Sequence, residues 1–172
     1  MNGEEEFRKG MELLQSNEPW NFRKALEHFC EAADKGHVEA TFEIGRMYLN
    51  GMPPQIAQNV LKAVKCFKIS ADEGLVEAKY YLALCYFWGK GVEKDLQKAI
   101  TLFEENYRYG EPQSAHMLSF IYQEGIGVKA DRQKALECNA CARQARIVGA
   151  EIQYLNILRG NETINSEERN DF

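Results

Sequence analysis

A single residue pattern occurs three times along this chain of 172 residues, and a weaker copy precedes it. Each copy has a small residue, an aliphatic residue four positions later, a second small residue beside it, a tyrosine and a closing glycine. Such spacings place side chains on one face of a helix. A short repeat cannot bury its apolar face alone, so neighbouring copies have to stack. The copies are Ala40, Ile44, Gly45, Tyr48 and Gly51; Ala78, Leu82, Ala83, Tyr86 and Gly89; and Ser114, Leu118, Ser119, Tyr122 and Gly125.

A Lys-Ala pair recurs as well, and it predicts a partner helix in each repeat. Three residues before each lysine stands an Asn or Asp whose side-chain oxygen is expected to accept a hydrogen bond from the first helical turn. Ala63 follows Ala25 by 38 positions and Ala99 follows Ala63 by 36, which is the length of a helix pair. The expected caps are Asn21, Asn59, Asp95 and Asp131.

These patterns predict an all-α solenoid of four antiparallel helix pairs. The pairs are expected over about 4–36, 37–74, 75–110 and 111–159, within one repeat domain of residues 1–160. Beyond Gly149 the pattern changes, and apolar residues predict that the last helix is extended as a cap. Residues 161–172 are expected to form a disordered tail.

The string small-x-x-x-Leu-Gly-x-x-Tyr-x-x-Gly-x-Gly-Val-x-x-Asp-x-x-Lys-Ala resembles the Sel-1-like repeat, a relative of the tetratricopeptide repeat. The resemblance covers roughly residues 4–145. It is best where Gly89-Lys90-Gly91-Val92 precedes Asp95, and where Gly125-Ile126-Gly127-Val128 precedes Asp131. The second repeat departs from the pattern, with Gly51-Met52-Pro53-Pro54, so its loop is expected to protrude further.

The resemblance implies a right-handed superhelix whose first helices line a concave side, and a role as adaptor or scaffold in protein complexes. By analogy with the tetratricopeptide groove, it implies a stripe of partner-binding residues. Exposed aromatic side chains in one patch usually mark a binding site, and Arg46 is suited to anchor a carboxylate. Packing of the stripe on itself is the alternative. The residues are Phe42, Arg46, Leu49, Tyr80, Leu84, Phe87, Trp88, His116 and Phe120.

Composition argues against several classes of partner. The formal net charge of −5 and the pI near 5.4 disfavour nucleic acid, because phosphates require clustered Lys and Arg. The longest apolar run, from Tyr80 to Trp88, is too short to span a membrane. The five cysteines are an odd number without regular pairing, so free thiols and a cytoplasmic location are expected. Cys138 and Cys141 form a C-x-x-C without a second ligand pair, so no metal or cofactor is expected.

An enzyme is not expected, because catalysis requires a nucleophile, a base and stabilising donors that converge in one pocket. His28, His37 and His116 lie on different predicted elements without metal-ligand spacing. The favoured hypothesis is a non-catalytic module that binds a protein or peptide in an aromatic concave groove. The alternative is an immunity or regulatory protein that caps a basic toxin or effector through its acidic surface. A monomer or a weak homodimer is compatible with either hypothesis.

Overall fold

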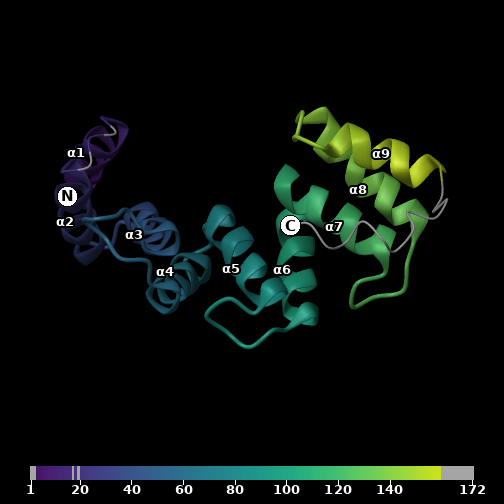
Figure 1. Ribbon diagram of the computed structural model, residues 1–172, viewed down its shortest axis with the longest axis horizontal. Helices are drawn as coiled ribbons and strands as arrows, with labels where there is room; N and C mark the ends of the chain where they lie inside the picture. Colours follow the sequence, from purple (N-terminus) through teal and green to yellow (C-terminus); the bar gives the residue numbers. More distant parts are fainter. Residues whose placement is uncertain (1–2, 17, 19, 160–172) are drawn as a thin grey trace. The chain divides into compact units, whose positions relative to one another are not determined.

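A computed structural model describes residues 3–16, 18 and 20–159 of the chain. Within this part the protein is an all-α helical repeat solenoid, as the sequence predicts, and its nine helices follow one another without a strand (Figure 1). They are α1 (Glu4–Gln15), α2 (Asn21–Asp34), α3 (Val38–Asn50), α4 (Val60–Asp72), α5 (Val76–Trp88), α6 (Leu96–Arg108), α7 (Pro112–Glu124), α8 (Arg132–Gln144) and α9 (Ala150–Arg159).

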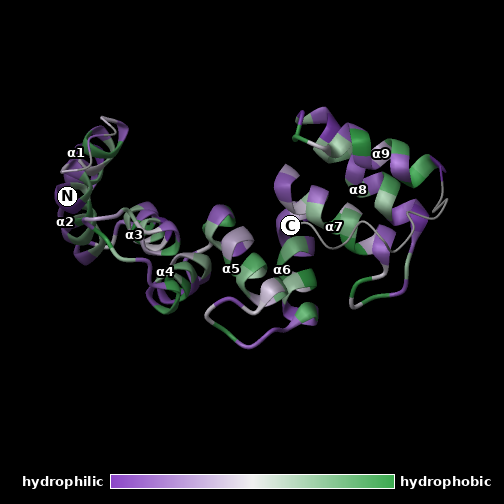
Figure 2. Cartoon of the chain, in the orientation of Figure 1, coloured by the Kyte–Doolittle hydropathy of each residue, from purple (hydrophilic) through white to green (hydrophobic). Residues whose placement is uncertain are grey.

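The chain divides into two compact units, Met1–Leu102 and Phe103–Phe172, called unit 1 and unit 2 below. In unit 1 each helix packs against the next in the sequence, from α1 through α5. Hydrophobic residues lie between hydrophilic ones along these helices (Figure 2), and buried apolar residues of neighbouring helices form common core clusters. Phe29 and Phe67 are fully buried at equivalent positions of α2 and α4, and each is part of one core cluster.

Small residues let the helices of a pair approach closely, as the repeat pattern predicts. A Cβ atom on Gly10 of α1 would lie 2.6 Å from the Phe29 ring. A Cβ atom on Gly45 of α3 would lie 2.7 Å from the Phe67 ring. Glycine at these positions therefore makes room for the phenylalanine of the partner helix.

Unit 2 repeats this packing with the remainder of α6 and with α7, α8 and α9. Helix α8 packs against both α7 and α9, and Leu118 and Ile121 of α7 are fully buried. The Tyr122 hydroxyl donates a hydrogen bond of 2.7 Å to Glu104. Burial raises the pKa of Tyr122, and the Glu104 carboxylate raises it further.

Three of the four predicted caps are confirmed. The side chains of Asn59, Asp95 and Asp131 each accept a hydrogen bond of 3.0 Å from the backbone N–H three residues later. The prediction for Asn21 is wrong, because Asn21 is already the first residue of α2 and its amide instead donates to the Ser16 hydroxyl.

The prediction of an extended last helix is also wrong. Helix α8 ends at Gln144, a turn follows in which Arg146 has a φ of 57° and Gly149 a φ of 85°, and α9 begins as a separate helix at Ala150. The loop with Pro53 and Pro54 has an exposed tip, but its end is fixed because Ile56 is buried in the core around Phe29.

Two predictions about chain organisation stay predictions. One is that residues 1–160 form a single domain, and the other is the disordered tail, which lies outside the described residues. Among the described helices, none is both long and apolar enough to cross a membrane.

Candidate functional site

A groove of about 630 Å³ opens in unit 1 between the last turns of α3 and α5. Leu49 and Asn50 come from α3, while Leu84 and Trp88 come from α5. Apolar and polar groups both line it in similar measure, and its other lining residues are Gln58, Val60, Tyr81, Cys85, Lys90 and Gly91.

Helix α5 supplies more of the groove-lining residues than any other element, and its sequence is suited to this position. It is the least amphipathic of the described helices because apolar residues occupy several of its faces. Leu82 and Ala83 are buried in the core, whereas Trp88 on another face is 59% exposed. The Trp88 ring makes an edge-to-face contact with Phe87, with 4.8 Å between the ring centroids. An exposed indole of this kind typically contributes strongly to protein binding.

The turn after α5 forms one side of the groove. Gly89 and Gly91 have φ values of 69° and 70°, in the left-handed region that favours glycine. A Cβ atom on Gly91 would lie 2.9 Å from the Val60 side chain and 3.1 Å from the Val60 carbonyl oxygen. The absence of a side chain at Gly91 therefore lets the turn lie against the start of α4, and places Lys90 at the groove.

The charge at the groove is positive. Among the described lining residues Lys90 is the only charged one, it is exposed, and it forms no ion pair within the described part of the chain. Cys85 lies in the groove wall, where burial raises the pKa of its thiol and the Lys90 ammonium partly offsets this effect. At pH 7 the groove therefore has one free cation and a neutral thiol.

Three of the nine predicted partner-binding residues lie together in this groove. They are Leu49, Leu84 and Trp88. Tyr80, on α5, is half-buried and its ring lies 5.7 Å from that of Tyr81 in an edge-to-face contact.

Three further predicted residues of unit 1 have different surroundings. Phe42 and Phe87 are 7% and 3% exposed, so both are core residues, and Phe42 packs against Phe67 and Tyr81. Arg46 donates to both carboxylate oxygens of Glu43, at 3.0 and 3.2 Å. Both hydrogen bonds come from Nη1 of Arg46, and its buried Nε atom has no hydrogen-bond partner within the described residues.

The remaining two predicted residues, His116 and Phe120, belong to α7 of unit 2. Phe120 is 39% exposed. His116 is half-buried, and burial lowers its pKa, so it is neutral at pH 7. Its Nδ1 atom is buried without a hydrogen-bond partner in the described chain.

The groove residues that come from loops and partner helices were not predicted from the sequence. Gln58 and Val60 precede or begin α4, and Lys90 and Gly91 follow α5. The sequence did contain a signal for Lys90, because the two glycines of the Gly-x-Gly turn determine where the residue between them lies. The tetratricopeptide analogy predicts partner-binding residues only on the first helix of each pair, and Lys90 lies outside these helices.

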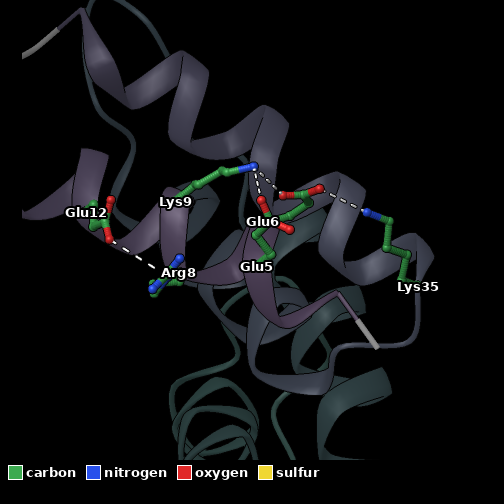
Figure 3. Close-up of polar contacts among 6 residues, drawn as sticks. All are labelled: Glu5, Glu6, Arg8, Lys9, Glu12 and Lys35. Atoms are coloured by element: carbon green, nitrogen blue, oxygen red, sulfur yellow. Dashed lines mark hydrogen bonds and ion pairs between the residues drawn. The ribbon is translucent and has the colours of Figure 1, made fainter. Parts of the chain in front are cut away.

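One cluster in the described chain has donor atoms of the type that bind metals. Ligand atoms of Glu6, His28 and Glu31 lie within 4.8 Å of one another. Glu6, however, already accepts hydrogen bonds from Lys35 at 3.1 Å and from Lys9 at 3.3 Å (Figure 3), and these lysines lower its pKa. Two ammonium groups beside the Glu6 carboxylate oppose a bound cation at this cluster.

The repeats of the chain match those of a known protein family. The model of the Sel1 repeat matches residues 8–37, 38–75, 76–105 and 112–138, which is more than half of the chain. The chain belongs to the Sel1 repeat family. Sel1 repeats generally mediate protein–protein interaction, and proteins of the family are typically non-catalytic.

Two curated relatives match about half of this Sel1 repeat chain. Chitin synthase regulatory factor 1 of Schizosaccharomyces pombe is 33% identical over 79 residues, which are 46% of this chain and 17% of the relative. DAP3-binding cell death enhancer 1 of Rattus norvegicus is 31% identical over 78 residues, which are 45% and 14%. The chain thus matches less than a fifth of the length of either relative.

Solved structures of Sel1 repeat proteins share the fold. A Sel1 repeat protein from Oxalobacter formigenes has a TM-score of 0.79 at 23% identity, over 89% of this chain and 62% of the other. The protective antigen c5321 of uropathogenic Escherichia coli has a TM-score of 0.77 at 26% identity, over 86% and 32%. The Sel1 repeat fold therefore covers nearly all of the described chain.

Proposed function

We propose that this protein is a non-catalytic interaction module that binds a segment of a partner protein in the groove between α3 and α5. The observation that supports this most is the convergence of Leu49, Leu84 and Trp88 on one open cavity. An exposed aromatic ring beside apolar side chains in a concave site is typical of a binding centre. Family membership supports a protein as the partner.

The names of the two curated relatives also fit this function. One is described as a regulatory factor and the other as a binding protein. Both descriptions suit a module that acts by holding another protein. The matched length is a small part of each relative, so their own partners are not transferred to this chain.

The alternative, an acidic surface that caps a basic toxin or effector, has weaker support. The first turn of α1 contains three glutamates, but the carboxylates of Glu5 and Glu6 are already paired with lysines (Figure 3). Glu5 lies 2.7 Å from Lys9, and Glu6 contacts both Lys9 and Lys35. Lys9 and Lys35 therefore offset the negative charge of Glu5 and Glu6 at this turn.

Affinity capture from a lysate of the source cell tests the groove proposal. Wild type, Trp88→Ala and Trp20→Ala are compared, because both indoles are exposed but only Trp88 lines the groove. We expect one protein to be retained by wild type and Trp20→Ala and lost with Trp88→Ala, while circular dichroism stays unchanged. Equal retention by all three proteins would contradict the groove as the binding site.

A further inference from the structure

We infer that the partner segment places an acidic side chain, Asp or Glu, beside the apolar side chain that enters the groove between α3 and α5. This inference rests on the proposed function and specifies the chemistry of its ligand. Three features support it: the single free charge of the groove, the helix that begins there, and the absence of arginine from the groove lining that the structure describes.

Lys90 supplies the charge that a carboxylate would meet. It stands between two glycines whose backbone conformation fixes the turn, and its own N–H donates a 2.9 Å hydrogen bond to the Cys85 carbonyl oxygen. The start of the side chain is thus anchored while the ammonium group is exposed and without a carboxylate in the described chain. No acidic residue is among the groove-lining residues that the structure describes, so nothing in the wall competes for this charge.

The start of α4 adds a second positive feature at the same place. Val60, its first residue, lines the groove. The Asn59 side chain satisfies the Lys62 N–H, but the N–H groups of Val60 and Leu61 have no acceptor within the described residues. The positive end of a helix dipole and its free N–H groups favour a nearby anion.

The geometry favours a side-chain carboxylate over the carboxyl terminus of a chain. Arginine can hold a carboxylate through two parallel hydrogen bonds, but no arginine is among the groove-lining residues that the structure describes. Lysine offers a compact charge on a flexible stem, which tolerates the variable reach of Asp or Glu within an extended segment. The apolar wall and Lys90 together therefore specify an apolar residue with an acidic neighbour.

A random-peptide library displayed on phage tests this inference even while the partner is unidentified. Selections are made with wild type, Lys90→Glu, Trp88→Ala and the control Lys65→Glu, which reverses an exposed lysine of α4 that does not line the groove. One enriched peptide and versions with its acidic residue changed to Ser or Lys are then titrated against each protein.

With wild type and Lys65→Glu we expect enrichment of Asp or Glu within two residues of a Leu, Phe or Trp. Lys90→Glu should enrich Lys or Arg there instead, and changing the acidic residue of the peptide to Ser should weaken wild-type binding about fivefold, as for an exposed ion pair. Trp88→Ala should enrich none of these peptides.

The outcomes separate the inference from the function on which it rests. Peptides that require Trp88 but show no acidic preference, or whose preference is unchanged by Lys90→Glu, would overturn the inference and leave the groove as a binding site. Absence of any Trp88-dependent enrichment would count against both.

Discussion

His37 shows how one side chain connects two elements of unit 1, α1 and α3. Its Nδ1 atom accepts a hydrogen bond of 3.3 Å from the Ala40 N–H and so caps α3. The Nε2 atom lies 3.1 Å from a Glu4 carboxylate oxygen of α1, and the ring stacks on Phe7 at 4.3 Å. The His37 side chain is only 7% exposed.

Substitution of His37 should therefore destabilise unit 1. We expect His37→Ala to lower the free energy of unfolding by about 1–2 kcal/mol, because the cap of α3 is lost. His37→Asn should lose roughly half as much, since an amide oxygen can cap the helix but cannot stack on Phe7. Urea denaturation measures both values, and equal stability of His37→Ala and wild type would contradict the capping role.

A repeated contact between tyrosine and lysine explains two of the recurring positions. In three successive repeats the lysine of the Lys-Ala pair places its ammonium group about 5 Å from the centre of the repeat tyrosine ring. The backbone carbonyl of the same tyrosine accepts a hydrogen bond from the cap residue. In the sequence these positions had separate interpretations, as packing residues and as helix starts. The pairs are Tyr48 with Lys62, Tyr86 with Lys98, and Tyr122 with Lys134.

The thiols should differ in reactivity because only the thiolate form is a nucleophile. Burial raises the pKa of Cys138 to about 11, with a contribution from Glu137, so this thiol stays protonated at pH 8. Cys30 is exposed on α2, and burial of part of its side chain raises its pKa as well. Accessibility therefore decides which of the two thiols reacts first.

We expect iodoacetamide at pH 8 to modify Cys30 well before Cys138, and mass spectrometry of tryptic peptides to show Cys138 modified mainly after denaturation. Because the folded pKa of Cys138 is raised, its modification should accelerate as the pH approaches 11. Fast modification of Cys138 in the folded protein at pH 8 would show that its environment is not the buried one described.

At the level of elements, α9 is held to unit 2 by polar groups as well as by apolar packing. Asn139 of α8 is fully buried and donates to the Ala150 carbonyl oxygen at 3.1 Å and to the Gln153 side chain at 3.3 Å. Arg132 donates to the carbonyl oxygens of Ile157 and Leu158, near the end of α9. These contacts fix both ends of the helix.

Removal of the Asn139 amide should release the start of α9. We expect Asn139→Ala to cost about 1–3 kcal/mol, because buried acceptors lose their donor, and to increase hydrogen exchange in α9 more than in α7. The control Gln133→Ala removes only an exposed contact with Glu137 on the same helix and should leave exchange unchanged. Exchange in α9 that is the same in both variants would argue against this anchoring.

Helix α9 also shows where sequence reasoning fails. The apolar residues after Gly149 were correctly expected to form helix, but Arg146 adopts a left-handed conformation that is uncommon for a residue other than glycine. Nothing in the local sequence marks Arg146 for this conformation. Regular elements such as α5 were predictable because repetition fixes both their packing face and their closing glycine.

For the whole molecule, periodicity predicts the all-α repeat fold because every interface uses the same few residues. It predicts the candidate site less well, since the same helical face contains core and surface positions. The sequence predicts Phe42, Phe87 and Trp88 alike as partner-binding residues. In the structure Phe42 and Phe87 are buried, whereas Trp88 is exposed. Lys90 and Val60 come from segments outside the first helices, and only the folded chain brings them together with Leu84.

The central claim is that a partner protein occupies the groove between α3 and α5. Photo-crosslinking tests it most directly, with a photoreactive amino acid placed in living source cells at Leu84 in the groove, or at Ile69, an exposed apolar residue of α4 outside it. The account predicts a discrete crosslinked protein from position 84 that is absent from position 69 and lost when Trp88→Ala is combined with the probe. Crosslinks that are the same from both positions, or that persist with Trp88→Ala, would contradict it.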